Sequence, residues 1–322
     1  MTDATIIGAG IAGLWVAHAL TERGLSVRLI DQNGAPGPHG CSWWAGGMLA
    51  PFCEGATAEP VITRLGQQAL TLWPQVSPVT VAGSLVVALD RDRAELDRFA
   101  RRTSGHEWLD ADHIAGLEPQ LAHKRALFFA DEGHVNPREA LADLVCALSD
   151  AGVPIERGAA QPDDLTGTVI DARGMASAAP GLRGVRGEMV ILNAPDIVLS
   201  RPIRLLHPRH PLYIVPRGDG VYMLGATQIE SGARGPITAR SMLELLSAAY
   251  ALDPRFAEGE VIETGTDLRP AFADNIPRVI VRGRVLHVNG LFRHGYLMAP
   301  VLAQQVADYL TTRSKGELIH ED

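Results

Sequence analysis

The stretch Ala4-Thr5-Ile6-Ile7-Gly8-Ala9-Gly10-Ile11-Ala12-Gly13 decides the fold of this chain. Its first four residues predict a short buried strand, and residues 11–23 predict a helix that Gly24 ends. A second strand is expected over residues 26–30, with Asp31 directly after it. Strand, glycine turn, helix and strand together indicate a βαβ unit whose turn has the spacing of a dinucleotide-binding motif.

Each residue of this motif has a physical role in binding a dinucleotide. Gly8 permits the tight turn, Gly10 lets a pyrophosphate approach the backbone, and Gly13 lets the helix pack against the strand. The N-terminus of the helix offers free N–H groups and a favourable dipole to phosphates. Asp31 can accept hydrogen bonds from ribose hydroxyls and disfavours a 2′-phosphate, so NADP is the least favoured nucleotide. The motif leaves NAD and FAD open, and a glycine turn used only for packing is the alternative.

Beyond this unit, the hydrophobic pattern predicts two kinds of structure. One kind mixes helices and strands and extends the nucleotide-binding fold: a helix over 137–151, strands over 169–171 and 282–288, and a closing helix over 299–310. The other kind predicts antiparallel sheet with few helices: strands over 80–90, 185–192, 212–215 and 221–224, with a charged helix over 91–102 and a polar stretch to residue 119. A glycine- and proline-rich loop is expected over 33–47, and an apolar helix near Ile62.

Length and composition exclude several classes of protein. The chain has 322 residues, more than one hydrophobic core usually serves, and 46% of them are hydrophobic, so a disordered chain is excluded. A net charge of −8 has the wrong sign for nucleic acid. Cys41, Cys53 and Cys146 show neither a disulfide framework nor metal-ligand spacing, so we expect reduced thiols and no metal. Without a signal peptide or an apolar run of about 18 residues, we expect a cytoplasmic protein that does not enter a membrane.

Further motifs carry a resemblance to a known family. The segments Ser42–Pro51, Gly133–Arg138, Leu268–Pro270 and Gly290–Gly295 resemble, in this order, the motifs of the D-amino acid oxidase and glycine oxidase family of flavoproteins. The strand pair at Tyr213–Arg217 and Gly225–Thr227 is similar to that of the bacterial glycine oxidases, which feed thiamine thiazole synthesis.

This resemblance implies both the fold and the cofactor. The fold is an α/β FAD-binding Rossmann-like domain plus an α+β substrate lobe built on an antiparallel sheet. The FAD-binding domain is discontinuous, over 1–76, 120–180 and 266–322, and the substrate-binding domain covers 77–119 and 181–265. The C-terminal turn contains no cysteine, so FAD is expected to be non-covalent.

The resemblance also assigns positions around FAD. It places Gly8, Gly10 and Gly13 at the dinucleotide turn. The pyrophosphate and ribose positions are Ile11, Ala12, Asp31 and Gln32, and the segment under the flavin includes Cys41, Ser42, Gly46, Gly47 and Met48. The turn before the last helix is matched by Gly290, Leu291, Phe292, Arg293, His294, Gly295, Tyr296 and Leu297. Its N–H groups and the helix dipole would stabilise negative charge on the reduced flavin.

Three side chains match positions that bind the substrate in this family. Arg269 is the expected clamp for a substrate carboxylate, because its planar guanidinium binds two oxygens and stays charged when desolvated. Tyr213 would add a hydroxyl to the carboxylate, and Arg293 would be a second arginine, with an ion pair at the lobe interface as the alternative. The family chemistry is hydride transfer from a neutral amine, so His294 is not needed as a base.

The expected activity is oxidation of glycine, sarcosine or a small D-amino acid to an imine that yields glyoxylate, with O2 as acceptor and a link to thiazole synthase. The alternatives are a D-amino acid oxidase or amine dehydrogenase of other substrate range, and a flavin-binding sensor without activity. Gln228 occupies the position of a methionine in a glycine oxidase, which leaves the selectivity for the substrate side chain open. No role is assigned to Trp43 and Trp44. Self-association into a homo-oligomer is also left open.

Overall fold

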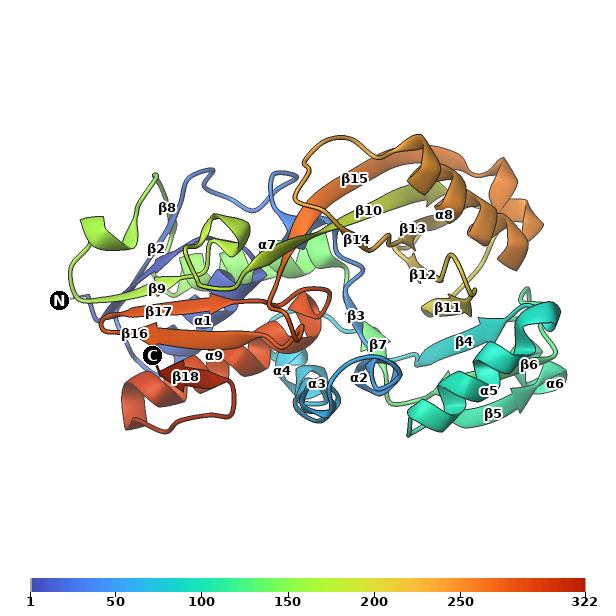
Figure 1. Cartoon of the computed structure of the whole chain (residues 1–322), viewed down its shortest axis with the longest axis horizontal. Coiled ribbons are helices and arrows are strands. Elements are labelled where there is room, and N and C mark those ends of the chain that lie inside the picture. The colour runs from blue at the N-terminus through green and yellow to red at the C-terminus, as the bar shows by residue number, and fades with distance from the viewer. Residues whose placement is uncertain (1, 322) are drawn as a thin grey trace.

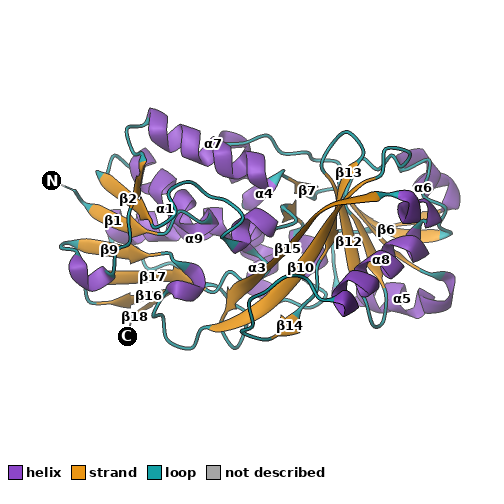
Figure 2. Ribbon diagram, turned by 90° about the horizontal axis from the view of Figure 1, so that it is seen from above, coloured by secondary structure: helices purple, strands orange, loops and turns teal. Residues whose placement is uncertain are grey.

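The computed structural model describes residues 2–321, which form two bodies placed along the long axis of the molecule (Figure 1). Each body is built on one large sheet. The long strands β10 (Arg183–Asn193) and β15 (Glu260–Ala271) of the second sheet lie side by side and reach toward the first body (Figures 1 and 2). This arrangement confirms the expected fold class of a Rossmann-like domain with a second lobe on a largely antiparallel sheet. The domain limits stay a prediction, and β15 runs across the expected boundary at residues 265 and 266.

The first body holds the βαβ unit. Within the described residues its seven-stranded sheet has the spatial order β18 (Ile319–Glu321), β16 (Arg278–Arg282), β17 (Val285–Asn289), β9 (Thr168–Asp171), β1 (Ala4–Ile7), β2 (Val27–Asp31) and β8 (Ile155–Arg157). All neighbours are parallel except β16 and β17. Its principal helices are α1 (Ile11–Glu22), α7 (Pro137–Asp150) and α9 (Gly295–Thr312). Helix α1 contacts both α7 and α9, and Leu14, Trp15 and Leu20 on it are buried in the shared core.

The second body is built on a nine-stranded sheet within the described residues. Its order is β14 (Ile229–Glu230), β10 (Arg183–Asn193), β13 (Val221–Gly225), β12 (Leu212–Pro216), β11 (Ile203–Leu206), β4 (Ser84–Ala88), β6 (Arg125–Phe129) and β5 (Glu107–Asp110), with β15 (Glu260–Ala271) also paired to β10. Only β4 and β11 are parallel neighbours. Its helices are α5 (Arg93–Arg102), α6 (Ala111–Leu117) and α8 (Ala239–Leu252).

Short elements connect the two bodies. They are the helices α2 (Pro51–Glu54), α3 (Pro60–Gly66) and α4 (Ala69–Leu72), and the two-stranded sheet of β3 (Met48–Leu49) and β7 (Gly133–His134). Most of the expected loop over 33–47 is irregular, with a single 3₁₀ turn at Cys41–Trp44. No helix within residues 2–321 is long and apolar enough to cross a membrane.

The structure contains several local elements that were not predicted from the sequence. The polar stretch before residue 119 contains β5 and α6, and Asp110 caps α6 by accepting a hydrogen bond from the N–H of His113 at 3.0 Å. The strand expected over 282–288 is the second half of a hairpin, because Gly283, with φ of +56°, reverses the chain between β16 and β17. Helix α8 and the long strand β15 had no assignment from the sequence.

The closing helix begins at Gly295 rather than residue 299, and it continues through Pro300. Proline lacks an N–H, so the Tyr296 carbonyl four residues earlier loses its donor within the helix. The Trp73 indole N–H donates to this carbonyl at 2.7 Å and replaces the missing bond. A tertiary contact therefore permits what the local sequence disfavours.

The turn between β1 and α1 generates a stability prediction. Gly8 has φ of +104°, and a Cβ on Gly13 would lie only 1.8 Å from the Gly8 carbonyl oxygen. Gly13→Ala must push α1 away from the turn, and we expect a loss of about 1 to 3 kcal/mol in the free energy of unfolding. A lower melting temperature would be measured by circular dichroism. Gly116→Ala is the control, because nothing lies within 4 Å of its Cβ and it should be neutral or stabilising; equal melting temperatures for both variants would contradict the packing argument.

Candidate active site

A cavity of about 940 Å³ is lined by residues of both large sheets. The expected site residues that line it are Gly8, Gly10, Ile11, Ala12, Asp31, Gln32, Cys41, Ser42, Gly46, Gly47, Met48, Tyr213, Arg269, Leu291, Phe292, Arg293, His294, Gly295, Tyr296 and Leu297. The other two do not line it. Gly13 faces the Gly8 carbonyl, and a Cβ on Gly290 would lie 2.2 Å from the Phe272 ring, so both glycines permit close packing behind the cavity wall.

The dinucleotide turn is fixed by a hydrogen bond to the end of β2. One carboxylate oxygen of Asp31 accepts from the N–H of Ala9 at 2.9 Å, and the other accepts from the N–H of Asn33 at 2.8 Å. Each oxygen keeps a further lone pair that a ribose hydroxyl can use. A Cβ on Gly10 would meet only the Ser42 hydroxyl, at 3.4 Å, so the turn presents open backbone to the cavity.

The segment around Ser42 joins this turn to the last helix. The Ser42 hydroxyl accepts from the N–H of Ile11 at 3.1 Å, which is the first N–H of α1. The phenol of Tyr296 lies 3.0 Å from the carbonyls of Ser42 and Pro137 and donates to them. Burial raises the pKa of Tyr296 well above its ordinary value, so this donor stays protonated. Tyr296 thus links two separate segments of the cavity wall, and its ring is stacked on that of Trp73.

The glycine pair in the same wall is held by a buried arginine. The Arg217 guanidinium donates to the carbonyls of Ala45 at 2.9 Å and Gly46 at 3.0 Å, and burial lowers its pKa to about 10. A Cβ on Gly47 would lie 2.2 Å from the Val135 carbonyl, and its φ is +72°. The backbone turn therefore requires glycine at position 47, whereas the ring of Tyr213 covers Gly46.

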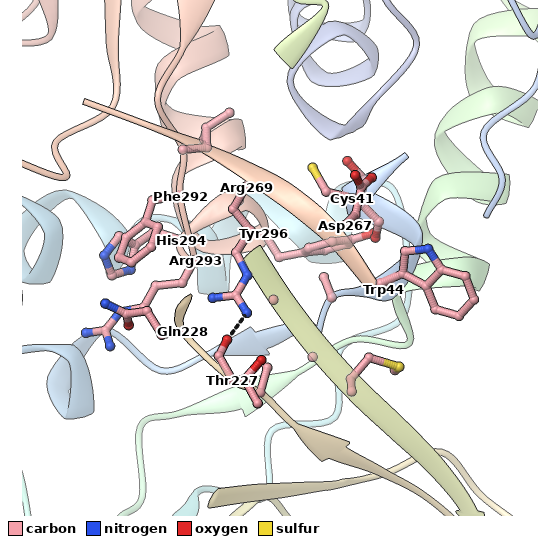
Figure 3. Close-up of a pocket in the computed structure, with 18 of the residues that line it drawn as sticks. Cys41, Trp44, Thr227, Gln228, Asp267, Arg269, Phe292, Arg293, His294 and Tyr296 are labelled. Carbon is pink, nitrogen blue, oxygen red and sulfur yellow. Dashed lines mark hydrogen bonds between the residues drawn. The ribbon is translucent and has the colours of Figure 1, made fainter. Parts of the chain in front are cut away.

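Arg269 is a cation of the cavity wall that has no ion pair with an acid. Its guanidinium points at the end of β13, where it donates to the Thr227 carbonyl at 2.7 Å (Figure 3). Among the described residues no carboxylate forms an ion pair with it, and burial lowers its pKa from the ordinary value. A guanidinium in this position has donors to spare and a desolvated charge without compensation.

Tyr213 lies next to Arg269 from a different strand. A Cβ on Gly46 would lie 3.1 Å from its Cε2 atom, and a Cβ on Gly225 would lie 3.2 Å from the same atom. The ring is therefore confined between two glycine backbones. Tyr213 lies close enough to Arg269 to oppose the lowering of the arginine's pKa by burial.

Arg293 is tied to an acid that the sequence did not point out. Its guanidinium lies 2.7 Å from Glu54, and the same carboxylate binds Arg204 at 3.0 Å. Burial alone would raise the pKa of Glu54, but Arg293 and Arg204 lower it to about 2, so the carboxylate is charged. Of the two arginines expected at the substrate, the structure leaves Arg269 available and gives Arg293 the ion pair that was its alternative.

His294 and Cys41 are electrically neutral in this setting. Burial lowers the pKa of His294 to about 4, with its Nδ1 3.5 Å from Glu54, so the imidazole is uncharged at neutral pH. Burial raises the pKa of the Cys41 thiol to about 12. The two side chains lie on opposite sides of Arg269 in Figure 3. Neither of them offsets the charge of that arginine.

The cavity residues to which the sequence argument gave no role include Glu54, Arg204, Gly187 and Thr227. Glu54 had a weak signal, as a lone acid at the end of the apolar run Met48–Cys53. Gly187 had none, and Thr227 lies in the quoted segment Gly225–Thr227 but received no role of its own. The importance of both residues depends on the strand pairing that brings them to Arg269.

Comparison with known proteins agrees with this geometry. Residues 3–309 match the family model DAO, described as FAD dependent oxidoreductase. The chain is 53% identical over 312 residues to a Rhizobium etli protein named as a thiamine biosynthesis oxidoreductase, ThiO, covering 95% of both chains. It is 25% identical to the glycine oxidase of Geobacillus kaustophilus, covering 95% of this chain and 92% of that one.

The fold is also found in a solved structure. The crystal structure of glycine oxidase from Geobacillus kaustophilus superposes with a TM-score of 0.84 at 22% identity, covering 98% of this chain and 96% of that one. These findings confirm the family to which the sequence motifs pointed, and with it FAD as the cofactor and oxidoreductase as the class of enzyme. The chain belongs to the DAO family of FAD dependent oxidoreductases.

Proposed function

We propose that this enzyme oxidises glycine or a comparably small amine that carries a carboxylate, with FAD as the electron acceptor. The observation that carries the proposal is the uncompensated charge of Arg269 inside the cavity. A substrate carboxylate would supply the missing anion in a bidentate, charge-assisted pair. The names of the relatives, ThiO and glycine oxidase, support the same substrate class.

The residues present fit FAD. The open backbone at Gly10 and the N-terminus of α1 suit a pyrophosphate, and Asp31 keeps lone pairs for ribose hydroxyls. At the other end, the turn over 290–294 leads into the N-terminus of α9, whose dipole favours negative charge. When bound, FAD supplies a two-electron acceptor that takes a hydride from the carbon next to the amine.

The chain's own residues orient the substrate and set its protonation. Arg269 would hold the carboxylate, and the hydroxyl of Tyr213 would add a second contact from the neighbouring strand. Positive charge from Arg269, Arg293 and Arg204 lowers the pKa of an amine bound beside them, which favours the neutral form that hydride transfer requires. His294 is neutral, so no proton acceptor at that position is part of the proposal.

Several features favour a small substrate. The Tyr213 ring is confined against Gly46 and Gly225, and Glu54 holds Arg293 in place, so these groups leave little freedom for a large side chain. In the proposed reaction, glycine, O2 and water give glyoxylate, ammonia and hydrogen peroxide. The imine formed first could instead be taken by the thiazole synthase of thiamine biosynthesis, a link supported by the name ThiO.

Gln228 supports a second candidate function. Its amide lines the cavity beside Thr227, where it can bind a polar group on a longer substrate (Figure 3). A D-amino acid oxidase of different range, or a dehydrogenase with an acceptor other than O2, would have the same carboxylate clamp. Substrate range therefore has to be measured.

Non-covalent FAD is the first prediction for the purified protein. Among the described cysteines only Cys41 lines the cavity, and its thiol is protonated at neutral pH. Denaturation in acid should leave a colourless precipitate and release all FAD into the supernatant, as measured by absorbance and chromatography. Yellow colour that stays with the precipitate, or release of a nicotinamide nucleotide, would exclude it.

Arg269→Ala should remove the substrate clamp without removing FAD. Loss of a charge-assisted bidentate contact should cost about 2 to 5 kcal/mol in transition-state binding. Steady-state kinetics with glycine would give this as the fall in kcat/KM. Arg64→Ala, which removes an exposed ion pair with Glu317 outside the cavity, is the control. An unchanged kcat/KM in Arg269→Ala refutes the role of this residue.

The substrate itself is tested by anaerobic bleaching of the bound flavin. We expect glycine and sarcosine to reduce the flavin faster than D-alanine or D-proline, and larger D-amino acids least, because of the confined Tyr213 wall. Admission of O2 should restore the yellow colour with formation of peroxide. If only a bulky amine bleaches the flavin, the preference for glycine is wrong and the second candidate stands; bleaching without reoxidation by O2 would indicate another acceptor.

A further inference from the structure

Strand β10 carries a buried ion pair close to the cavity. Arg186 and Glu188 are two residues apart, so their side chains leave the strand on the same face. Glu188 Oε1 accepts from Arg186 Nη2 at 2.7 Å and from Nε at 2.9 Å, and the two residues are 7% and 0% exposed. Burial alone would raise the pKa of Glu188, but hydrogen bonds from Ser241 and Arg186 lower it, so the carboxylate is charged.

The pair holds the segment 227–238, which connects β13 to α8. At its start, the Thr227 hydroxyl donates to Glu188 Oε2 at 3.2 Å. Two bonds from the backbone of Glu188 also reach Thr227: its N–H donates to the Thr227 hydroxyl at 3.0 Å, and its carbonyl accepts from the Thr227 N–H at 3.1 Å. At its end, the N–H of Thr238 donates to Glu188 Oε1 at 3.2 Å. The middle is held by the Arg186 guanidinium, which donates to the carbonyls of Ala233, Gly235 and Pro236.

The same strand also guides Arg269. Arg269 on β15 pairs with Val185, and its side chain crosses β10 at Gly187, where a Cβ would lie 1.9 Å from Nη2. The guanidinium then ends on the Thr227 carbonyl at 2.7 Å (Figure 3). Thr227 is thus bound to Glu188 on one side and to Arg269 on the other.

Stability alone gives little reason for such a pair. Removing two charges from water offsets most of their attraction, so apolar residues of the same volume could fill the site about equally well. Apolar side chains could not bind the Thr227 hydroxyl and the Thr238 N–H, as the Glu188 carboxylate does. Nor could they bind the three carbonyls that the Arg186 guanidinium binds. The functional consequence of the ion pair is therefore that it fixes the position of Thr227.

We propose that Arg186 and Glu188 are positioning residues that fix the 227–238 segment and, through the Thr227 carbonyl, set the direction in which Arg269 meets the substrate. This inference rests on the proposed role of Arg269 as the carboxylate clamp. It assigns a function in substrate binding to two residues that need not touch the substrate. A misplaced guanidinium would bind a carboxylate through one oxygen rather than two.

The test is the binding of glycolate, the hydroxyl analogue of glycine, to the holoenzyme, followed by the absorbance change of the bound flavin. Glu188→Gln should weaken glycolate binding about 10- to 100-fold while FAD stays bound. Glu118→Gln is the matched control, since Glu118 forms a buried pair with Arg201 at 2.7 Å in the same body of the molecule but does not line the cavity. Equal glycolate affinity in the two variants would overturn the inference.

A double-mutant cycle separates positioning from general damage to the fold. If Glu188 acts through Arg269, Glu188→Gln should have no further effect on glycolate binding in the Arg269→Ala background. A full additional loss in that background would overturn the inference and leave the clamp standing. Glycolate binding that is unchanged in Arg269→Ala itself would overturn the clamp and the inference with it.

Thr227→Val is the milder variant if Glu188→Gln does not fold. It removes the hydroxyl that joins Thr227 to Glu188 and keeps the size of the side chain and the carbonyl that Arg269 uses. We expect weaker glycolate binding that also disappears in the Arg269→Ala background. Unchanged binding in Thr227→Val would contradict the link between Glu188 and Arg269.

Discussion

The antiparallel pairing of β10 with β15 is the constraint on which the site depends. These strands pair from Arg183 with Ala271 to Asn193 with Glu260, with one bulge near Ile191. The pairing sets Arg269 opposite Val185 and beside Gly187. At the end of β15, the Pro270 carbonyl accepts from the N–H of Phe292 at 2.9 Å, which ties the substrate sheet to the turn before α9. One ladder of backbone hydrogen bonds thus fixes Arg269, the proposed carboxylate clamp, relative to the cofactor-binding body.

The distribution of charge in the cavity follows from one shared acid. Glu54 binds Arg204 and Arg293 and lies near His294, so one carboxylate serves several basic groups. Arg269 stands apart from this cluster and has only a backbone carbonyl. A cavity with more cations than acids attracts an anion and disfavours a protonated amine, and oxidation of a small amino acid needs both effects.

Several segments of the cavity wall are held by side chains that bind backbone carbonyls. Arg217 holds the carbonyls of Ala45 and Gly46, and Tyr296 holds that of Ser42. The Arg186–Glu188 pair does the same for the 227–238 segment. Buried donors and acceptors are expensive to leave unpaired, so each of these bonds restricts a loop that local sequence would leave free.

The sequence by itself determined the βαβ unit, because short-range periodicity and glycine geometry are local properties: β1, α1 and β2 lie where they were predicted, and Gly24 has the expected positive φ of +76°. Motif resemblance also brought the family and FAD within reach, and nearly all the positions that it assigned line the cavity. Only the tertiary structure decided which arginine stays free, since Glu54 and Arg293 are distant in sequence and meet at 2.7 Å. It also decided that α9 continues through Pro300, because the compensating donor is Trp73, far away in the chain. Contacts of this kind depend on strand pairing and packing between distant segments, which no local pattern encodes.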